Sequence, residues 1–345
     1  MDFSFLGLVT SHASEMDFAF RSLADTIVRN SQLSISLLRI SNVTGDSFHV
    51  SLEALISRTG PASASITAMT VDLCGPSGHF GNVTLPALTT QRNGTEVVVT
   101  NQLVDIIDHG ALKAFIQALI HDGALLSLRN GKTSIAAFGI GPRHIVYEKE
   151  ILLPGMKGPA VDMRAASLIP SALPPSAVAE SPSTASLGGV MRSPTTTSIL
   201  STSGGNAVSI VFQVTNPSPL EISFGTCSFD ILDYQDRPLA ELKGRLDIRR
   251  GQFEITFRGT VNKSAMMSLA REFNLDKSHR GRAAKSISSQ LPQARLVGKR
   301  CAGAGWCDET IKSLDMPLWN VEKLFHALDI DWQSRDFPIV KSGKC

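Results

Sequence analysis

Residues 208–231 read VSIVFQVTNPSPLEISFGTCSFDI. Apolar and polar residues alternate on both sides of the NPSP segment, and this alternation is typical of strands that bury one face. Pro217 and Pro219 lack the amide hydrogen that a strand ladder needs, so NPSP is predicted to be the turn of a β-hairpin. The buried positions move from even to odd numbers at Gly225, which predicts a β-bulge at this glycine.

The same pattern recurs along most of the chain. Residues 48–56 alternate in the same way, and amphipathic helices are predicted over 108–120 and 264–273. Each helix follows a strand that begins beside a turn glycine, in RNGTEVVVTNQLVDIIDHGALKAFIQAL (92–119) and in RRGQFEITFRGTVNKSAMMSLAREF (249–273). We interpret this correspondence as an internal duplication of one β-sandwich unit.

A change in composition marks the predicted boundary between the units. Residues 165–205 are rich in Ser, Thr, Pro, Ala and Gly and nearly uncharged, which is typical of a linker or a long exposed loop. Such a segment is unusual inside one compact domain, so we place a domain boundary there. The predicted fold class is mainly β, with two tandem antiparallel β-sandwiches that each carry a short amphipathic helix. The predicted parts are an N-terminal helical segment (1–30), a first sandwich (31–164), the linker (165–205), a second sandwich (206–300) and a C-terminal extension packed on the second sandwich (301–345).

The composition and the absence of motifs exclude several classes of function. The chain of 345 residues is 43% hydrophobic and 19% charged, and its net charge of +2 gives no electrostatic basis for nucleic-acid binding. No stretch approaches the roughly 18 consecutive apolar residues that could span a bilayer. The eight histidines show no metal-binding spacing, and the sequence contains no phosphate-binding glycine motif and no nucleophile elbow. We therefore predict no catalytic residue, no metal, no cofactor and a protein that is not an enzyme.

Two of the five cysteines are close in sequence. Cys301 and Cys307 flank the flexible stretch AGAGW, and a disulfide between them would stabilise the folded state by about 2–3 kcal/mol. The odd number of cysteines favours the alternative of two reduced thiols. Cys301–Cys307 is therefore a candidate disulfide, with both alternatives open.

Four N-glycosylation sequons are present, at Asn42, Asn82, Asn93 and Asn262. Three of them lie in predicted turns between strands, where a modifying enzyme could reach them. They favour the lumen of the secretory pathway, and coincidence in a chain rich in Ser and Thr is the alternative.

Several segments resemble known families. VTNPSPLEISFGTCSFDI (214–231) resembles the strand–NPSP–strand signature of the late-embryogenesis-abundant group-two domain, the water-stress and hypersensitive-response type. The first half resembles a family of fungal vacuole-membrane proteins with tandem domains of this kind. The segments that carry this second resemblance are GNVTLPALTT (81–90), VTNQLVDIIDHGALKAFIQALI (99–120), LRNGKTSIAAFGI (128–140) and EKEILLPGMKGP (148–159). LPGM is the most specific of these matches.

The resemblance implies a location and a class of activity. Members of the fungal family are mostly single-pass membrane proteins whose paired domains face the vacuolar lumen, and a characterised member helps to end autophagosome formation. The family's membrane helix, expected ahead of residue 20, is missing from this sequence, so we expect a soluble relative or a sequence without its upstream exon. The family brings no catalytic residues. We therefore predict a non-enzymatic protein on the lumenal side of the fungal vacuole membrane that binds protein or lipid partners and is linked to autophagy.

Two alternatives belong to other classes of function. Kinship with the plant domain would fit a soluble stress-protective protein, by fold analogy alone. Cys301 and Cys307 would fit a hydrolase or redox enzyme, although no nucleophile–base pair can be identified.

Overall fold

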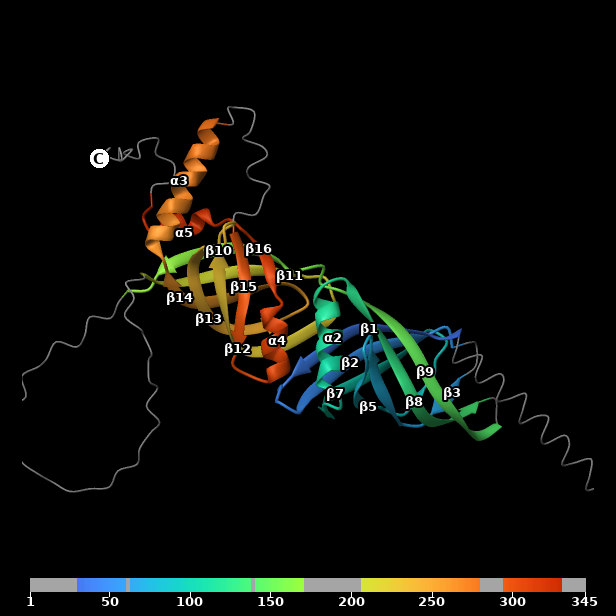
Figure 1. The fold of residues 1–345 in the computed structure, drawn as a ribbon. Helices are drawn as coiled ribbons and strands as arrows, with labels where there is room; N and C mark the ends of the chain where they lie inside the picture. The colour runs from blue at the N-terminus through green and yellow to red at the C-terminus, as the bar shows by residue number, and fades with distance from the viewer. Residues whose placement is uncertain (1–29, 60–62, 138–139, 171–205, 280–293, 331–345) are drawn as a thin grey trace, which may run out of the picture.

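The computed structural model describes residues 30–59, 63–137, 140–170, 206–279 and 294–330, which form two β-rich units side by side (Figure 1). The mainly β fold predicted from the sequence is confirmed. The helical segment predicted for residues 1–30 falls almost entirely outside the described residues.

The first unit consists of two sheets that face each other across an apolar core. One sheet contains β1 (Gln32–Ser41), β2 (Ser47–Ser57) and β7 (Thr95–Asp105), in this order. The other has the order β5-β4-β8-β3-β6, with β9 also paired to β8. Its strands are β3 (Ala64–Ile66), β4 (Met69–Gly75), β5 (Gly78–Leu85), β6 (Leu88–Thr89), β8 (Gly123–Ala137) and β9 (Ile140–Pro154). The alternating residues of β2, from Phe48 to Ile56, are buried, as the sequence predicted.

Helix α2 (His109–Ile120) packs on the first unit and lies beside the second (Figure 1). Its predicted apolar face is buried, and Phe115 stacks on Phe80 of β5 with ring centroids 5.0 Å apart. Asp108 caps the helix by accepting a hydrogen bond from the amide of Ala111 at 2.9 Å. Capping therefore accounts for the carboxylate of Asp108.

The second unit is a closed barrel. Its seven strands follow the order β13-β14-β11-β10-β16-β15-β12, and β12 also pairs with β13. The strands are β10 (Ala160–Leu168), β11 (Asn206–Asn216), β12 (Leu220–Leu232), β13 (Pro238–Ile248), β14 (Gly251–Val261), β15 (Ala294–Cys301) and β16 (Asp315–Trp319). Helices α3 (Lys263–His279), α4 (Gly305–Lys312) and α5 (Glu322–Ala327) lie outside it. The helix predicted over 264–273 is confirmed as α3.

The structure places the first residues of the segment 165–205, up to Leu168, in the second unit. Strand β10 runs across residue 164, where the first domain was predicted to end, and it pairs with its antiparallel neighbour β11. Residues 169–205 thus connect two adjacent strands of one barrel, and residues 171–205 lie outside the described ones. The predicted C-terminal extension also supplies β16, which lies between β10 and β15. These additional strands close the second unit into a barrel, where the sequence predicted a β-sandwich.

The opening stretch, 208–231, confirms two predictions and overturns a third. Its two strands are β11 and β12, and their bulge lies between Ser223 and Gly225, with a φ of 78° at Gly225. The hairpin prediction is wrong, because β11 pairs with β10 and β14, whereas β12 pairs with β1, β13 and β15. The NPSP turn is therefore a corner between two parts of the barrel wall.

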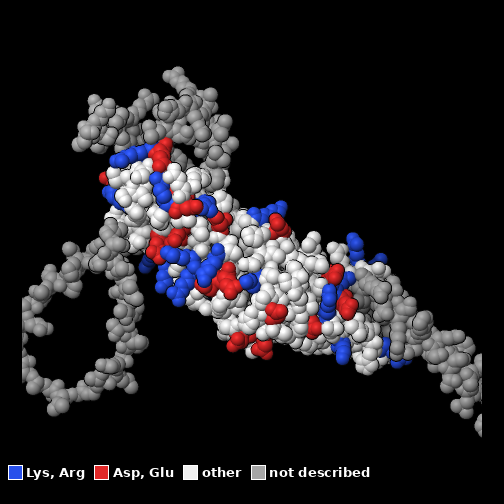
Figure 2. Space-filling view, viewed as in Figure 1, with Lys and Arg blue, Asp and Glu red and all other residues white. Residues whose placement is uncertain are grey.

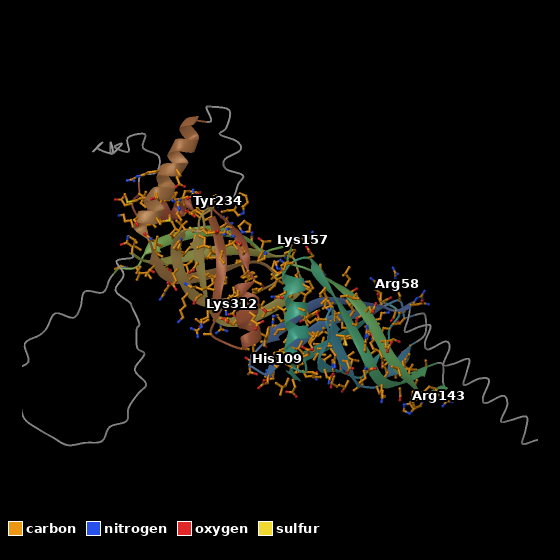
Figure 3. All side chains as sticks on the ribbon, in the orientation of Figure 1. Arg58, His109, Arg143, Lys157, Tyr234 and Lys312 are labelled. Carbon is orange, nitrogen blue, oxygen red and sulfur yellow. The ribbon has the colours of Figure 1, made fainter. Side chains whose placement is uncertain are left out.

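The two units share a sheet and a core. β1 pairs in parallel with β12 from Leu38–Leu220 to Ile40–Ile222, so the first sheet continues the barrel wall. The buried apolar residues of both units form one contiguous cluster. Helices α2 and α4 pack together beside this junction, where Lys113 forms an ion pair with Glu309. His109 and Lys312 label the two helices in Figure 3.

The chain crosses between the units in the segment LPGMKGP, residues 153–159. Three consecutive amides, those of residues 156–158, donate to the carbonyls of Leu119, His121 and Ile120 at 2.6–3.2 Å. Carbonyls at the end of a helix lack intrahelical partners, so this segment completes the C-terminus of α2. In Figure 3 the label of Lys157 shows where this segment lies, at the junction of the two units. The most specific segment of the family resemblance is thus a structural joint.

Asp233 gives the barrel a pH-dependent contribution to stability. It is buried in the turn between β12 and β13 and accepts hydrogen bonds from the amides of Gln235 (2.8 Å) and Arg237 (2.9 Å) and from the Arg237 guanidinium. Burial alone would raise the pKa of Asp233, but the hydrogen bonds and the charge of Arg237 lower it overall. A lowered pKa contributes stability above the unfolded value, near 3.9, which is lost as the pH falls through the folded value.

We expect Asp233→Asn to lower the free energy of unfolding at pH 7 by about 1–3 kcal/mol. Urea denaturation at pH 7 and at pH 3 measures this, and the difference from the wild type should shrink at pH 3. Glu254→Gln, which changes an exposed carboxyl on β14, is the control and should have little effect at either pH. An equal loss at both pH values for Asp233→Asn would contradict the role of its ionised form.

Candidate functional site

The first unit contains an apolar cavity between its two sheets. The cavity has a volume of about 40 Å³ and is lined by side chains of both sheets and of α2. All of the lining residues are hydrophobic: Leu33, Ile35, Leu38, Ile40, Phe48, Val50, Leu52, Ile56, Ile66, Met69, Leu73, Phe80, Val83, Leu85, Leu88, Val97, Phe115, Leu126, Leu128 and Tyr147. Burial raises the pKa of Tyr147 to about 12, so its phenol is neutral at physiological pH.

The partly buried residues of the lining include two on the short strands β3 and β6 at the edge of the second sheet. Ile66 of β3 and Leu88 of β6 are cross-strand partners, and both are only partly buried, as is Ile35 of β1. The remaining lining residues belong to the buried core. An apolar group could therefore reach the cavity past Ile66 and Leu88 with the smallest displacement of the core.

Only apolar groups are expected to enter this cavity, because its lining is hydrophobic. A buried water needs two to four polar partners, so a hydrophobic cavity of this kind stays dry. An apolar group that enters it leaves water and gains free energy in proportion to the area that it buries. The cavity is well below the roughly 150 Å³ that holds benzene in an engineered core. It therefore admits a compact apolar group or the end of a hydrocarbon chain.

Three thiols gather in the barrel. Cys227 of β12 lies directly opposite Cys301 of β15, Cys307 lies in the first turn of α4, and all three are buried free thiols. The amide of Ala302 donates to the carbonyl of Thr226 at 2.8 Å, so Cys227 and Cys301 form a non-hydrogen-bonded pair, in which side chains are closest. Cys74, in the first unit, is half-buried and lies apart from this cluster.

The thiols of the cluster interact with one another, and the Cys301 thiol also donates a hydrogen bond to the carbonyl of Phe224 at 3.1 Å. The thiols of Cys227 and Cys307 hydrogen-bond to Cys301 and lower its pKa, against the opposing effects of burial and of the Asp308 charge. The contact with Cys301 and burial raise the pKa of Cys227 and of Cys307. The candidate disulfide Cys301–Cys307 remains a prediction. The structure adds Cys227 as a second partner for Cys301, which sequence spacing could not reveal.

The four candidate glycosylation sites all lie on the surface. Asn42 follows β1, Asn93 lies in the turn before β7, and Asn82 is an exposed residue of β5. Asn262 precedes α3, and its side-chain oxygen accepts a hydrogen bond from the amide of Ala265 at 3.1 Å. A glycan on Asn262 would be attached through the side-chain nitrogen and would leave this oxygen able to cap the helix, and Asn42 and Asn93 stand in exposed turns.

Two other kinds of feature are absent from the described part of the chain. No group of three His, Cys, Asp or Glu side chains there could hold a metal ion. Within the same ranges, no helix is both long enough and apolar enough to cross a membrane.

Comparisons with known proteins identify one domain. Residues 78–169 match the model of a family described as a protein of unknown function (DUF3712), and this match runs from β5 through α2 to β10. The chain is thus a β-rich protein with a DUF3712 domain. No curated protein matches it. Among solved structures, the crystal structure of the YadV chaperone matches with 8% identity over 67% of this chain and 85% of that chain, at a TM-score of 0.18. A similarity at this level supports no conclusion about fold or function.

Proposed function

We propose that this chain is a non-catalytic binding protein whose first unit takes an apolar group into the cavity between its sheets. The observation that carries the proposal is the lining, which is hydrophobic throughout and reaches partly exposed side chains at Ile66 and Leu88. Ligand sites in proteins are lined predominantly by hydrophobic and aromatic side chains, as this cavity is. A lipid acyl chain or a hydrophobic side chain of a partner protein has the right chemistry to place its end there.

The proposed location follows from the family resemblance. We place the two units on the lumenal side of the fungal vacuole membrane, with a role linked to autophagy. The LPGMKGP joint supports the resemblance, because it organises the contact between the two units in this chain. The four exposed sequons are compatible with a lumenal location, and glycosidase treatment of native material tests it by a shift in gel mobility.

Filling the cavity tests the binding proposal. Val97 lines the cavity, and its neighbour Val98 points outward from the same strand and is 51% exposed. We expect the wild type to bind cis-parinaric acid, a fluorescent fatty acid, and Val97→Phe to reduce the affinity at least tenfold. A side chain that fills a cavity commonly stabilises a protein by about 0.5–2 kcal/mol, so the melting temperature should be kept or raised.

Val98→Phe is the matched control and should change neither binding nor stability. If Val97→Phe overpacks the core, Val83→Leu adds less volume to the same cavity and should still weaken binding. A wild type that does not bind the fatty acid, or a folded Val97→Phe variant that binds it as well as the wild type, would overturn the proposal.

A further inference from the structure

A row of exposed cations crosses the outer wall of the barrel. Lys243 of β13 lies opposite Arg258 of β14, and Ser228 of β12 lies opposite both Lys243 and Arg300 of β15. The strand register therefore places Arg258, Lys243 and Arg300 at one level across four neighbouring strands. We call these three residues the basic row. Figure 2 shows Lys and Arg side chains gathered over this part of the barrel.

A β-bulge in β15 provides one member of the row. The register shifts between Ser228 and Phe229, so the consecutive residues Lys299 and Arg300 are both exposed. Lys299 forms ion pairs with Asp230 (3.3 Å) and Glu241 (3.2 Å). Lys299 thus balances one of the two acidic charges beside the row, and Arg300 forms no ion pair with either carboxylate.

The charges of the basic row are not balanced within the described structure. Like charges directly opposite each other on neighbouring strands are destabilising, as for Lys243 and Arg258. No ion pair in the described ranges joins a member of the row to a carboxylate. Asp308 lies near Arg300, but its carboxylate already binds Lys312 and the amide of Cys301. An anion from outside the chain would relieve this repulsion.

We propose that the basic row binds the anionic lipid headgroups of a membrane surface. Arg258 and Arg300 are three strand spacings apart, about 14 Å, so one phosphate group cannot contact both. A surface that carries many headgroups can contact Lys243 together with a neighbouring arginine of the row, because all three side chains are exposed. The row has no aromatic side chain on which nucleic-acid bases could stack. This surface lies on the second unit and is independent of the cavity in the first.

Lys243→Glu tests the proposal without weakening the fold. The new carboxylate faces Arg258 and Ser228, so it replaces a repulsive cross-strand pair by an attractive one. Each Lys or Arg near an anionic membrane strengthens binding about fivefold, and a reversal removes two charges. We expect sedimentation with phosphatidylserine-containing vesicles to show an affinity about 20- to 30-fold lower, with an unchanged or raised melting temperature.

Lys132→Glu is the matched control, because Lys132 is an exposed residue of β8 in the first unit. It makes the same change in net charge and should alter the affinity less than twofold. Vesicles of phosphatidylcholine alone should not bind the protein, and added salt should weaken binding to the anionic ones. The proposal is overturned if the wild type does not bind anionic vesicles at low salt, if both variants weaken binding equally, or if single-stranded RNA binds more tightly than the vesicles.

Discussion

Gly155→Ala is expected to lower the free energy of unfolding by about 3 kcal/mol or more. A Cβ atom at this position would lie 2.4 Å from the amide nitrogen of Gly123, 2.4 Å from the carbonyl oxygen of His121 and 2.5 Å from the carbonyl carbon of Asp122. All three atoms belong to the backbone that follows α2, so none can rotate away as a flexible side chain would. Relief of the clash must move residues 156–158, and their amides would then leave the end of the helix.

Gly141→Ala is the control, because a Cβ atom at residue 141 would meet nothing within 4 Å. Chemical denaturation of both variants measures the difference in stability. Because α2 also supplies Phe115 to the cavity, Gly155→Ala should weaken fatty-acid binding as well. A Gly155→Ala variant as stable as Gly141→Ala would show that the joint tolerates expansion.

The local elements of this fold follow from the sequence. The alternation in β2 and in 208–231, the apolar face of α2 and the bulge at Gly225 all depend on residues that are neighbours in the chain. Each was therefore visible as a period or as a change of period. The strand-then-helix order shared by 92–119 and 249–273 is also present, as β7–α2 and β14–α3.

The pairing of the strands could not be predicted in this way. β7 lies beside β2, whereas β14, its counterpart in the proposed duplication, lies between β11 and β13. Composition was also misleading near residue 165, because Ala165, Ala166 and Ser167 belong to a strand although they resemble the adjoining linker-like sequence. Their neighbours β11 and β16 are far along the chain, and a linear pattern carries no information about such partners.

The candidate sites could not be predicted from the sequence for the same reason, because they depend on which strands pair and pack together. The cavity is the space left between side chains from Leu33 to Tyr147, and only their three-dimensional packing decides whether space remains. The third thiol, Cys227, and the basic row depend on the register of β12 with β13 and β15. The spacing along the chain identified Cys301 and Cys307 as possible partners, because these two are close in sequence. It gave no indication that Cys227 lies beside them.

Asn216→Ala is the second substitution for which we expect a large loss, about 3 kcal/mol. Asn216 is fully buried at the start of NPSP. Its side-chain amide donates to the carbonyls of Leu220 (2.8 Å) and Arg249 (3.0 Å), and its oxygen accepts from the amide of Ser218 (2.9 Å). Alanine would leave these buried backbone groups unpaired, and each such group costs about 1–3 kcal/mol when water cannot replace the lost partner. The expected loss lies at the lower end of the range for all three groups together, because the contacts share one side chain and relaxation at the corner restores part of them.

Because Asn216 lies beside the junction between the units, we expect its substitution to loosen this junction more than the rest of the fold. Ser218, which Asn216 holds in place, donates from its hydroxyl to the carbonyl of Pro154 at 2.8 Å, and the next residue, Pro219, accepts from the amide of Leu38 at 2.9 Å. Hydrogen exchange should therefore accelerate at Leu38 and along the β1–β12 pairing in Asn216→Ala, more than in β2 or β7. Asn206→Ala, at the other end of β11 and only partly buried, is the control and should change neither stability nor exchange at the junction. Uniform acceleration over the whole chain would show that Asn216 stabilises the barrel alone, without a particular role in holding the two units together.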